Sequence, residues 1–261
     1  SAGLWFLHDT GLSDQFLPEL RGLRLEQDPI HRHKDVLSHT IAVVAKAPAR
    51  DRLRLAALFH DVGKPSTRAI GDNGVSFHHH EVVGARMTRE RMRALKFSND
   101  MVKDVTELVY LHLRFHTFEM GWSDAAVRRF VRDAGPLLED LMDLTRSDCT
   151  TRNRRKAEQL ERNLDLLASR IEDLRAREEL ASIRPDLDGA AVMAHLGVPP
   201  GPVVGAALAH LLELRLEHGP LGEEQAIDAL NSWWATQDHG SIDYGTSGQS
   251  NAESTSASPA T

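Results

Sequence analysis

Along most of the chain, apolar residues recur at intervals of three and four, which is the periodicity of an amphipathic helix. Residues such as Pro48 and Gly63 end the periodic stretches, and a turn-rich loop is expected over 70–77. No stretch has the pattern of a strand, so the chain is predicted to be all-α. The predicted helices cover a short lead-in over 4–26, then 36–47, 51–61, 81–95, 98–116, one that follows Ser123, 136–148, a long helix over 152–180, and three more between Asp188 and Trp234. Ser98, Ser123 and Asp188 are predicted to cap the helices that they precede.

The long charged helix over 152–180 carries a single apolar seam. Its members alternate between spacings of four and three, namely Leu160, Leu164, Leu167, Ile171 and Leu174. Such a seam packs either on a neighbouring helix of the same chain or on another molecule as a coiled coil. We expect the first arrangement, and the coiled coil is the alternative.

Composition and charge narrow the class of protein. The 261 residues are 41% hydrophobic and 26% charged, which suits a water-soluble chain of one or two domains. A formal charge of −7 means that any contact with nucleic acid depends on local basic patches. Cys149 is the only cysteine, which excludes a disulfide framework and favours a reducing cytoplasm. No apolar run approaches the length of a membrane span, so no membrane partner is expected.

Histidines are the strongest compositional signal, because nine of the fourteen lie between His31 and His116. Within this region, polar groups stand at the ends of predicted apolar helix faces. His39 shares a face with Val36, the pair His60-Asp61 ends a leucine-rich helix, and Asp148 follows a leucine series. A buried imidazole or carboxylate without a partner is costly. A divalent cation held by His39, His60, Asp61 and Asp148 would satisfy these groups together, whereas the alternative is a set of buried polar caps without metal.

The order of these residues resembles the signature of the HD-domain metal-dependent phosphohydrolases, a superfamily of helical domains. The segments "KDVLSHT" (34–40) and "HDVGKP" (60–65) are similar to its first two motifs, and "HHHEVVGA" (78–85) and "SDC" (147–149) are similar to the later ones. An isolated His-Asp pair would carry no weight. Four segments in the family's order, each with fitting flanks, imply a metal-dependent site for phosphoester hydrolysis.

The resemblance and the chemistry of the residues suggest individual roles. Asp61 is expected to orient or deprotonate a water through an oxygen left free by the metal, and Lys64 to reach a phosphate as a point charge. His80 and His112 are expected either to donate a proton to the leaving oxygen or to hold a second ion. The ion is divalent (manganese, nickel, iron, cobalt or magnesium), and one or two are implied. The remaining histidines of the cluster are expected in loops or as partly buried residues without a metal, namely His31, His33, His78, His79 and His116.

A second resemblance covers about residues 3–235. The segments "GLSDQFLPELRGL" (11–23), "RPDLDG" (184–189) and "GVPPGPVVG" (197–205) resemble the C-terminal body of bacterial CCA-adding tRNA nucleotidyltransferases and poly(A) polymerases. This implies a lead-in (1–28), an HD domain (29–150) and a helical, tRNA-binding body (151–235). The residues from 236 to 261, rich in Gly, Ser, Thr and Ala, are expected to be disordered.

One feature of that enzyme family has no counterpart in the sequence. The family adds nucleotides with an N-terminal head that carries a glycine-rich segment and paired aspartates, and neither is found here. We therefore expect the C-terminal portion of such an enzyme, and a free-standing HD relative is the alternative.

The stretch "RNRRK" (152–156) is the leading candidate for contact with RNA. Arg152, Arg154, Arg155 and Lys156 lie at a helix start, where cations oppose the helix dipole. The phosphates of a tRNA would compensate them, and so would the acidic residues of a packed helix. The arginine-rich stretch 86–96 is a weaker candidate.

Two functions follow from these patterns. In the first, the protein hydrolyses phosphoesters such as 2′,3′-cyclic nucleotides or RNA 3′ ends with a metal at the His/Asp site. In the second, a non-catalytic body binds tRNA and its metal is structural. The partners are tRNA or an RNA 3′ end together with small phosphoesters, and the oligomeric state is left open.

Overall fold

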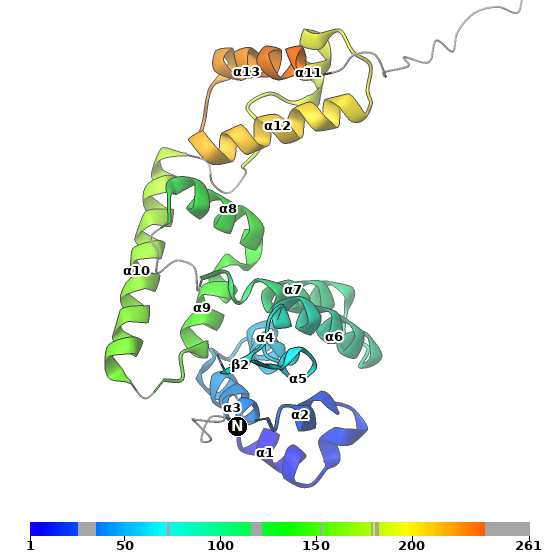
Figure 1. Ribbon diagram of the computed structural model, residues 1–261, viewed down its shortest axis with the longest axis vertical. Helices are drawn as coiled ribbons and strands as arrows, with labels where there is room; N and C mark the ends of the chain where they lie inside the picture. The colour runs from blue at the N-terminus through cyan, green and yellow to red at the C-terminus, as the bar shows by residue number, and fades with distance from the viewer. Residues whose placement is uncertain are drawn as a thin grey trace, which may run out of the picture.

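The chain folds into helices joined by short connections, as Figure 1 shows. The computed structural model describes residues 1–25, 35–71, 74–115, 122–151, 153–178, 180 and 183–237. In chain order the helices are α1 (Ala2–Asp9), the 3₁₀ turn η1 (Leu12–Gln15), α2 (Glu19–Gly22), α3 (Val36–Lys46), α4 (Asp51–Phe59), α5 (Lys64–Thr67), α6 (His80–Ala94), α7 (Asn99–Leu111), α8 (Asp124–Ala134), the 3₁₀ turn η3 (Gly135–Leu137), α9 (Leu138–Asp148), α10 (Arg154–Arg177), α11 (Gly189–Leu196), α12 (Pro202–His218) and α13 (Glu223–Ala235). The predicted all-α class is confirmed.

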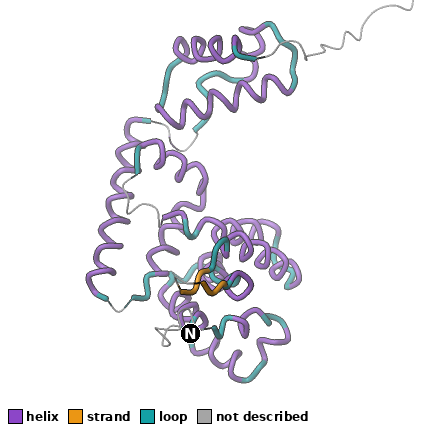
Figure 2. The backbone as a smooth tube through the Cα atoms, viewed as in Figure 1, coloured by secondary structure: helices purple, strands orange, loops and turns teal. Residues whose placement is uncertain are grey.

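A short antiparallel hairpin departs from the predicted pattern. Strand β1 (Ala69–Gly71) pairs with β2 (Gly74–Ser76), with Ile70 opposite Val75 (Figure 2). The sequence predicted only a turn-rich loop here. Strands of three residues are too short to show an alternating pattern, although the β-branched pair Ile70 and Val75 suits cross-strand contact.

Helix starts follow the predicted caps. Ser98 Oγ accepts from the backbone N–H of Met101, Ser123 Oγ accepts from Ala126, and Asp188 caps α11 in the same way. These side chains satisfy backbone donors that the first turn leaves unpaired. The three predicted caps are confirmed.

Two predicted helix ends lie beyond the observed ones, by two residues in α4 and by about five in α7. Helix α4 ends at Phe59, so His60 and Asp61 stand in the turn that follows rather than in the helix. Helix α7 ends at Leu111 rather than near residue 116, so His112 also lies just past a helix. In both cases the histidine side chain bonds to a backbone carbonyl of the last turn, which ends the helix without a left-handed glycine.

One hydrophobic cluster joins α2–α4 and α6–α10. It runs from Leu17 through α3, α4 and α6–α9 to Leu180, and α6 and α7 lie side by side within it (Figure 1). The seam of α10 is part of this core, because Leu164, Leu167 and Leu174 are fully buried in it. The predicted intramolecular packing of the seam is therefore confirmed.

A second, smaller cluster lies in α11–α13 and runs from Leu187 to Leu230. Figure 1 shows these helices at one end of an elongated molecule, with the N-terminus near the other end. Helix α12 packs against α8, which joins the two cores. The domain boundaries drawn from the sequence are still predictions. Among the described helices, none combines the length and the apolar character required to cross a lipid bilayer.

Candidate metal centre

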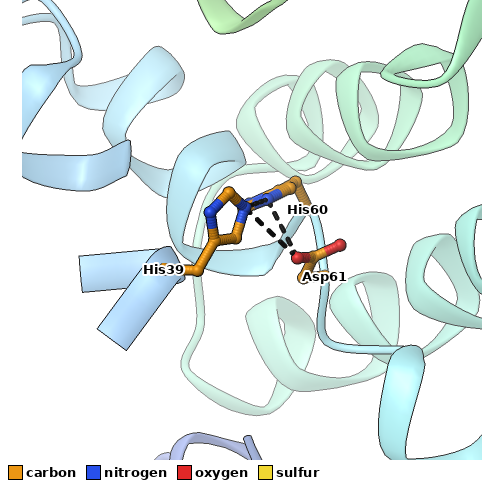
Figure 3. Close-up of side chains that lie close together, drawn as sticks. All are labelled: His39, His60 and Asp61. Carbon is orange, nitrogen blue, oxygen red and sulfur yellow. Dashed lines mark hydrogen bonds and ion pairs between the residues drawn. The ribbon is translucent and has the colours of Figure 1, made fainter. Parts of the chain in front are cut away.

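Residues from three helices converge at one point, as the sequence predicted. His39 lies in α3, His60 and Asp61 follow α4, and Asp148 is the last residue of α9. The Nε2 atoms of His39 and His60 are 3.2 Å apart, and they lie 3.5 and 3.3 Å from Asp61 Oδ2 (Figure 3). Asp148 Oδ1 is 2.8 Å from His39 Nε2 and 3.4 Å from His60 Nε2. Two imidazoles and two carboxylates therefore face a common centre.

The local sequence explains why these polar groups are held inside the protein. Apolar residues of α3, α4 and α9 bury one face of each helix, and the polar groups continue those faces at or near the helix ends. His60 and Asp61 are each only 1% exposed. The cost of removing them from water is offset only by close partners of opposite charge.

The pKa values of these groups reflect that close pairing. Burial alone would lower the pKa of His60, but the carboxylates of Asp61 and Asp148 raise it to about 10. Burial would raise the pKa of the Asp61 carboxyl, yet the neighbouring cationic His60 holds it well below its usual range. The pKa of Asp148 is also held well below its usual range, against the effect of burial, by hydrogen bonds with His39 and His60. The centre therefore favours a positive charge between two ionised carboxylates.

A second group of potential ligands shares Asp61. Asp61, His80 and His112 place one side-chain donor atom each within 4.8 Å of one another, and all three residues are buried. Asp61 Oδ1 lies 3.4 Å from His80 Nε2. The Nε2 atoms of His80 and His112 are buried and make no hydrogen bond within the described part of the chain. Asp61 thus has one oxygen towards each group, and the expectation that a metal leaves one of its oxygens free is still a prediction.

Hydrogen bonds set the tautomer of the three buried rings. Nδ1 of His60 lies 2.8 Å from the carbonyl of Ala57, and the same nitrogen of His80 and His112 bonds to the carbonyl three residues earlier. Because a carbonyl only accepts, each Nδ1 carries the proton, and Nε2 points into the centre as a potential ligand. Burial, together with the charge of His60, lowers the pKa of His112 to about 3, so this ring is neutral.

Lys64 lies beside the centre. Its ammonium donates to Asp61 Oδ2 at 2.8 Å and stands 5.6 Å from the centre of the Phe77 ring. The side chain is 15% exposed, so the charge is partly shielded from water. This position suits the predicted contact with a phosphate, which remains a prediction.

The other histidines of the cluster do not join the centre where the structure describes them. His78 and His79 are exposed, as predicted. The predictions for His31, His33 and His116 lie outside the described residues, and so does the predicted disorder over 238–261.

The basic stretch at the start of α10 is only partly compensated by ion pairs. Arg154 is 92% exposed and pairs with Glu158 four residues on, at 2.7 Å. Arg155 and Lys156 are exposed. Arg152, the fourth predicted RNA contact, lies outside the described residues. Glu158 shows that part of the predicted compensation comes from the helix itself.

The donor set fits a divalent metal ion. Imidazole nitrogens and carboxylate oxygens in one buried group suit first-row transition metals, and carboxylates also suit magnesium. The unpartnered Nε2 atoms of His80 and His112 are otherwise unexplained, since buried polar atoms are normally satisfied. These residues could hold one ion at each group, with Asp61 common to both.

Comparison with known proteins identifies the domain that contains this site. The HD domain family matches residues 36–153, which contain every residue of both groups. The chain therefore carries an HD domain, and the expected resemblance to the superfamily is confirmed.

Two curated bacterial proteins are similar over nearly the whole chain. The A-adding tRNA nucleotidyltransferase of Deinococcus radiodurans is 37% identical over 247 residues, 92% of this chain and 56% of the relative. The CC-adding tRNA nucleotidyltransferase of Thermus thermophilus is 36% identical over 242 residues, 89% of this chain and 52% of the relative. The chain spans about half the length of these curated relatives. It is related to the C-terminal part of the tRNA nucleotidyltransferase family, as its motifs indicated.

Two contacts near the centre involve residues that the sequence patterns did not single out. Thr150 Oγ1 lies 2.8 Å from His39 Nδ1, and Lys46 Nζ donates to the carbonyls of Arg146 and Cys149. Thr150 stands two positions after Asp148, and Lys46 lies seven positions after His39 on the same helix. The sequence could have pointed to Thr150 through its closeness to Asp148, and to Lys46 through its position two helical turns after His39.

Proposed function

We propose that the protein is a metal-dependent phosphohydrolase that acts on phosphoesters such as 2′,3′-cyclic nucleotides or RNA 3′ ends. The observation that carries this proposal is the convergence of His39, His60, Asp61 and Asp148, from three helices, within contact distance of one another. An arrangement that buries two carboxylates against imidazoles is costly for a purely structural role. It suits a site that holds a divalent cation.

The proposal assigns the ligands as follows. His39, His60, Asp61 and Asp148 hold the first ion, and Asp61, His80 and His112 hold a second where two bind. A bound divalent ion, such as manganese, nickel, iron, cobalt or magnesium, supplies an acidified water and neutralises charge on a phosphoryl group. A ligand set of imidazoles and carboxylates is compatible with all of these metals and does not select one of them.

Three side chains are assigned the other roles in phosphoester hydrolysis. Asp61 orients the attacking water, which is consistent with its position between the two groups. Lys64, held 2.8 Å from Asp61, neutralises a phosphate oxygen as a point charge. Where it does not hold a metal, His80 donates to the leaving oxygen from Nε2, which requires a second proton on the ring in addition to the Nδ1 proton held by the Phe77 carbonyl.

The relatives suggest a biological setting. Because the two curated relatives are named as tRNA nucleotidyltransferases, we place the activity in tRNA 3′-end processing in the cytoplasm, with tRNA or an RNA 3′ end as the partner. Nucleotide addition would require a catalytic head outside the printed sequence. The basic residues Arg152, Arg154, Arg155 and Lys156 are proposed to contact the RNA backbone.

The test is hydrolysis by metal-stripped protein reloaded with one metal at a time. Substrates are 2′,3′-cyclic AMP and p-nitrophenyl phosphate, and Asp61→Ala is compared with the control Asp9→Ala, whose side chain is 64% exposed. We expect wild type and Asp9→Ala to be active with at least one metal, chelation to abolish activity, and Asp61→Ala to be folded but inactive. Equal activity of Asp61→Ala and wild type would contradict the proposal.

A second candidate is a non-catalytic tRNA-binding body with a structural metal. It is favoured by the names of the relatives and by the exposed cations at the start of α10. Replacing Arg154 and Arg155 by Ala should weaken tRNA binding and reduce the slope of log affinity against log salt by about 2. Arg175→Ala, at the far end of the same helix and paired with Glu172, is the control. Unchanged tRNA affinity in the double variant would exclude this surface.

A further inference from the structure

His39 differs from the other histidines of the centre in how its ring is held. His60, His80 and His112 each bond through Nδ1 to the carbonyl three residues earlier, so the local backbone sets their orientation. His39 lies inside α3, where the carbonyl three residues earlier belongs to the helix ladder. Its Nδ1 instead lies 2.8 Å from Thr150 Oγ1, a side chain 111 positions away. The orientation of this ring therefore depends on a second element.

A lysine of α3 holds the segment that carries Thr150. Lys46 Nζ donates to the carbonyl of Cys149, the residue directly after α9, at 3.1 Å and also to that of Arg146 in the last turn of α9. An ammonium group at a helix C-terminus also interacts favourably with the helix dipole. Lys46 and His39 lie two turns apart on α3, so this helix contacts the end of α9 at two points. The contact between His39 and Thr150 is thus anchored by a second, independent interaction.

We propose that Thr150 is a positioning residue that fixes the orientation of the His39 ring for metal binding. This inference rests on the metal site proposed above. Nε2 of this ring faces His60 and Asp148, where the first ion is expected. With an ion on Nε2, the proton would stand on Nδ1, and the Thr150 hydroxyl would accept it. Outer hydrogen-bond partners of this kind change metal affinity by about 10-fold to 100-fold when they are removed.

Thr150 is exposed, so an effect of its hydroxyl on metal binding can be distinguished from an effect on the stability of the fold. An exposed hydroxyl contributes little to the free energy of unfolding, so its loss should leave the metal-free fold unchanged. Its effect should therefore appear in metal affinity alone.

The experiment is a titration of metal-stripped full chain with Co²⁺, followed by its visible absorption. The variants are Thr150→Val, which keeps the shape and removes the acceptor, and Thr150→Ser, which restores it. Thr151→Val is the matched control, because Thr151 is the next residue and its hydroxyl accepts a hydrogen bond from the backbone of Asn153. Thermal unfolding of each metal-free variant reports whether the fold is retained, and Thr150→Ala replaces Thr150→Val if that variant does not fold.

We expect Thr150→Val to bind the first Co²⁺ about 10-fold to 100-fold more weakly than wild type, with an altered absorption spectrum and an unchanged melting temperature. Thr150→Ser and Thr151→Val should match wild type. Equal affinity of Thr150→Val and wild type, or a loss that Thr150→Ser does not restore, would overturn the role of Thr150 and leave the metal site standing. Absence of Co²⁺ binding by wild type would overturn both.

Discussion

At the residue scale, a proton on His60 occupies the position proposed for a metal. Asp61 and Asp148 raise the pKa of His60 to about 10 against the effect of burial, so at neutral pH the metal-free ring is cationic. The pKa of His112 is lowered to about 3, so that ring carries no proton on Nε2 to give up. The two groups that share Asp61 therefore differ in how they bind a cation. An ion that binds to Nε2 of His60 must displace a proton, whereas one that binds to Nε2 of His112 need not.

This difference predicts proton release when the first ion binds. Near pH 7, loading one equivalent of Mn²⁺ should release about one proton, and affinity should rise about tenfold per pH unit, because the neutral fraction of His60 increases as pH approaches its pKa. Calorimetric titration in two buffers of different ionisation enthalpy measures the number released. An affinity that is constant from pH 6 to pH 8 would contradict the assignment of His60 as a ligand.

The four residues of the first group could be predicted from the sequence. The hydrogen bonds that hold the Nδ1 atoms of the histidine rings could not. His39, His60, Asp61 and Asp148 end apolar helix faces and fall in four motifs in a fixed order, so their convergence was expected. Thr150 could not be assigned, because its contact with His39 depends on the packing of α3 against α9. The two directions of the Asp61 carboxylate likewise depend on three-dimensional geometry.

At the scale of the elements, a glycine sets how closely α6 approaches the turn after Asp61. Gly63 was predicted to end a helical stretch, and its φ is −78°, so a left-handed backbone is not the reason for a glycine here. A Cβ at this position would lie 2.2 Å from the carbonyl oxygen of His80 and 2.7 Å from the backbone nitrogen of Gly84. Backbone atoms cannot rotate away as a side chain does. Gly63 therefore allows the first turn of α6 to bring His80 to Asp61.

Gly63→Ala should consequently force α6 away from the centre. We expect a loss of about 1–3 kcal/mol or more in the free energy of unfolding, together with weaker binding of a second metal equivalent, measured by urea unfolding and metal titration. Gly205→Ala in α12 is the control, since nothing lies within 4 Å of its added Cβ. That helical substitution should raise stability by about 0.5–1 kcal/mol. Equal stability of the two variants would contradict the close-approach argument.

The seam of α10 gives a second prediction at this scale. Leu167 is fully buried in the first core, whereas its neighbour Leu166 is 56% exposed. Leu167→Ala should lower the free energy of unfolding by about 2–5 kcal/mol, and Leu166→Ala should change it by less than about 0.5 kcal/mol. Chemical denaturation of both variants checks the difference. A larger loss for Leu166→Ala would indicate that the exposed face packs on another molecule.

At the scale of the whole molecule, a buried ion pair joins the two hydrophobic cores. Arg128 of α8 forms two hydrogen bonds with Glu178, at 3.0 and 2.8 Å, and donates to the carbonyls of Leu216 and Glu217 at the end of α12. The Arg128 and Glu178 side chains are each only 7% exposed. Arg128 thus caps a helix of the second core from within the first. The sequence pattern did not indicate this contact, because Arg128 and Arg129 are adjacent in the predicted helix and no feature distinguishes the buried arginine from the exposed one.

Arg128→Met should uncouple the two cores. We expect a loss of about 3–5 kcal/mol, because Glu178 is left buried and without its main partner, and a separate unfolding transition for α11–α13. The neighbouring Arg129→Met is the control, since Arg129 is 36% exposed and pairs with the exposed Glu217. It should cost no more than about 1 kcal/mol. Calorimetry that shows equal effects for the two variants would contradict this account of the junction.

The central claim is that Nε2 of His39 and His60 and the carboxylates of Asp61 and Asp148 surround one divalent ion. Crystals grown with Mn²⁺ and measured for anomalous scattering test it most directly. We predict an anomalous peak within bonding distance of all four residues, with the nitrogens of His39 and His60 turned towards the ion. A fully ordered site with no peak, in which His60 still contacts Asp148 directly, would contradict the claim.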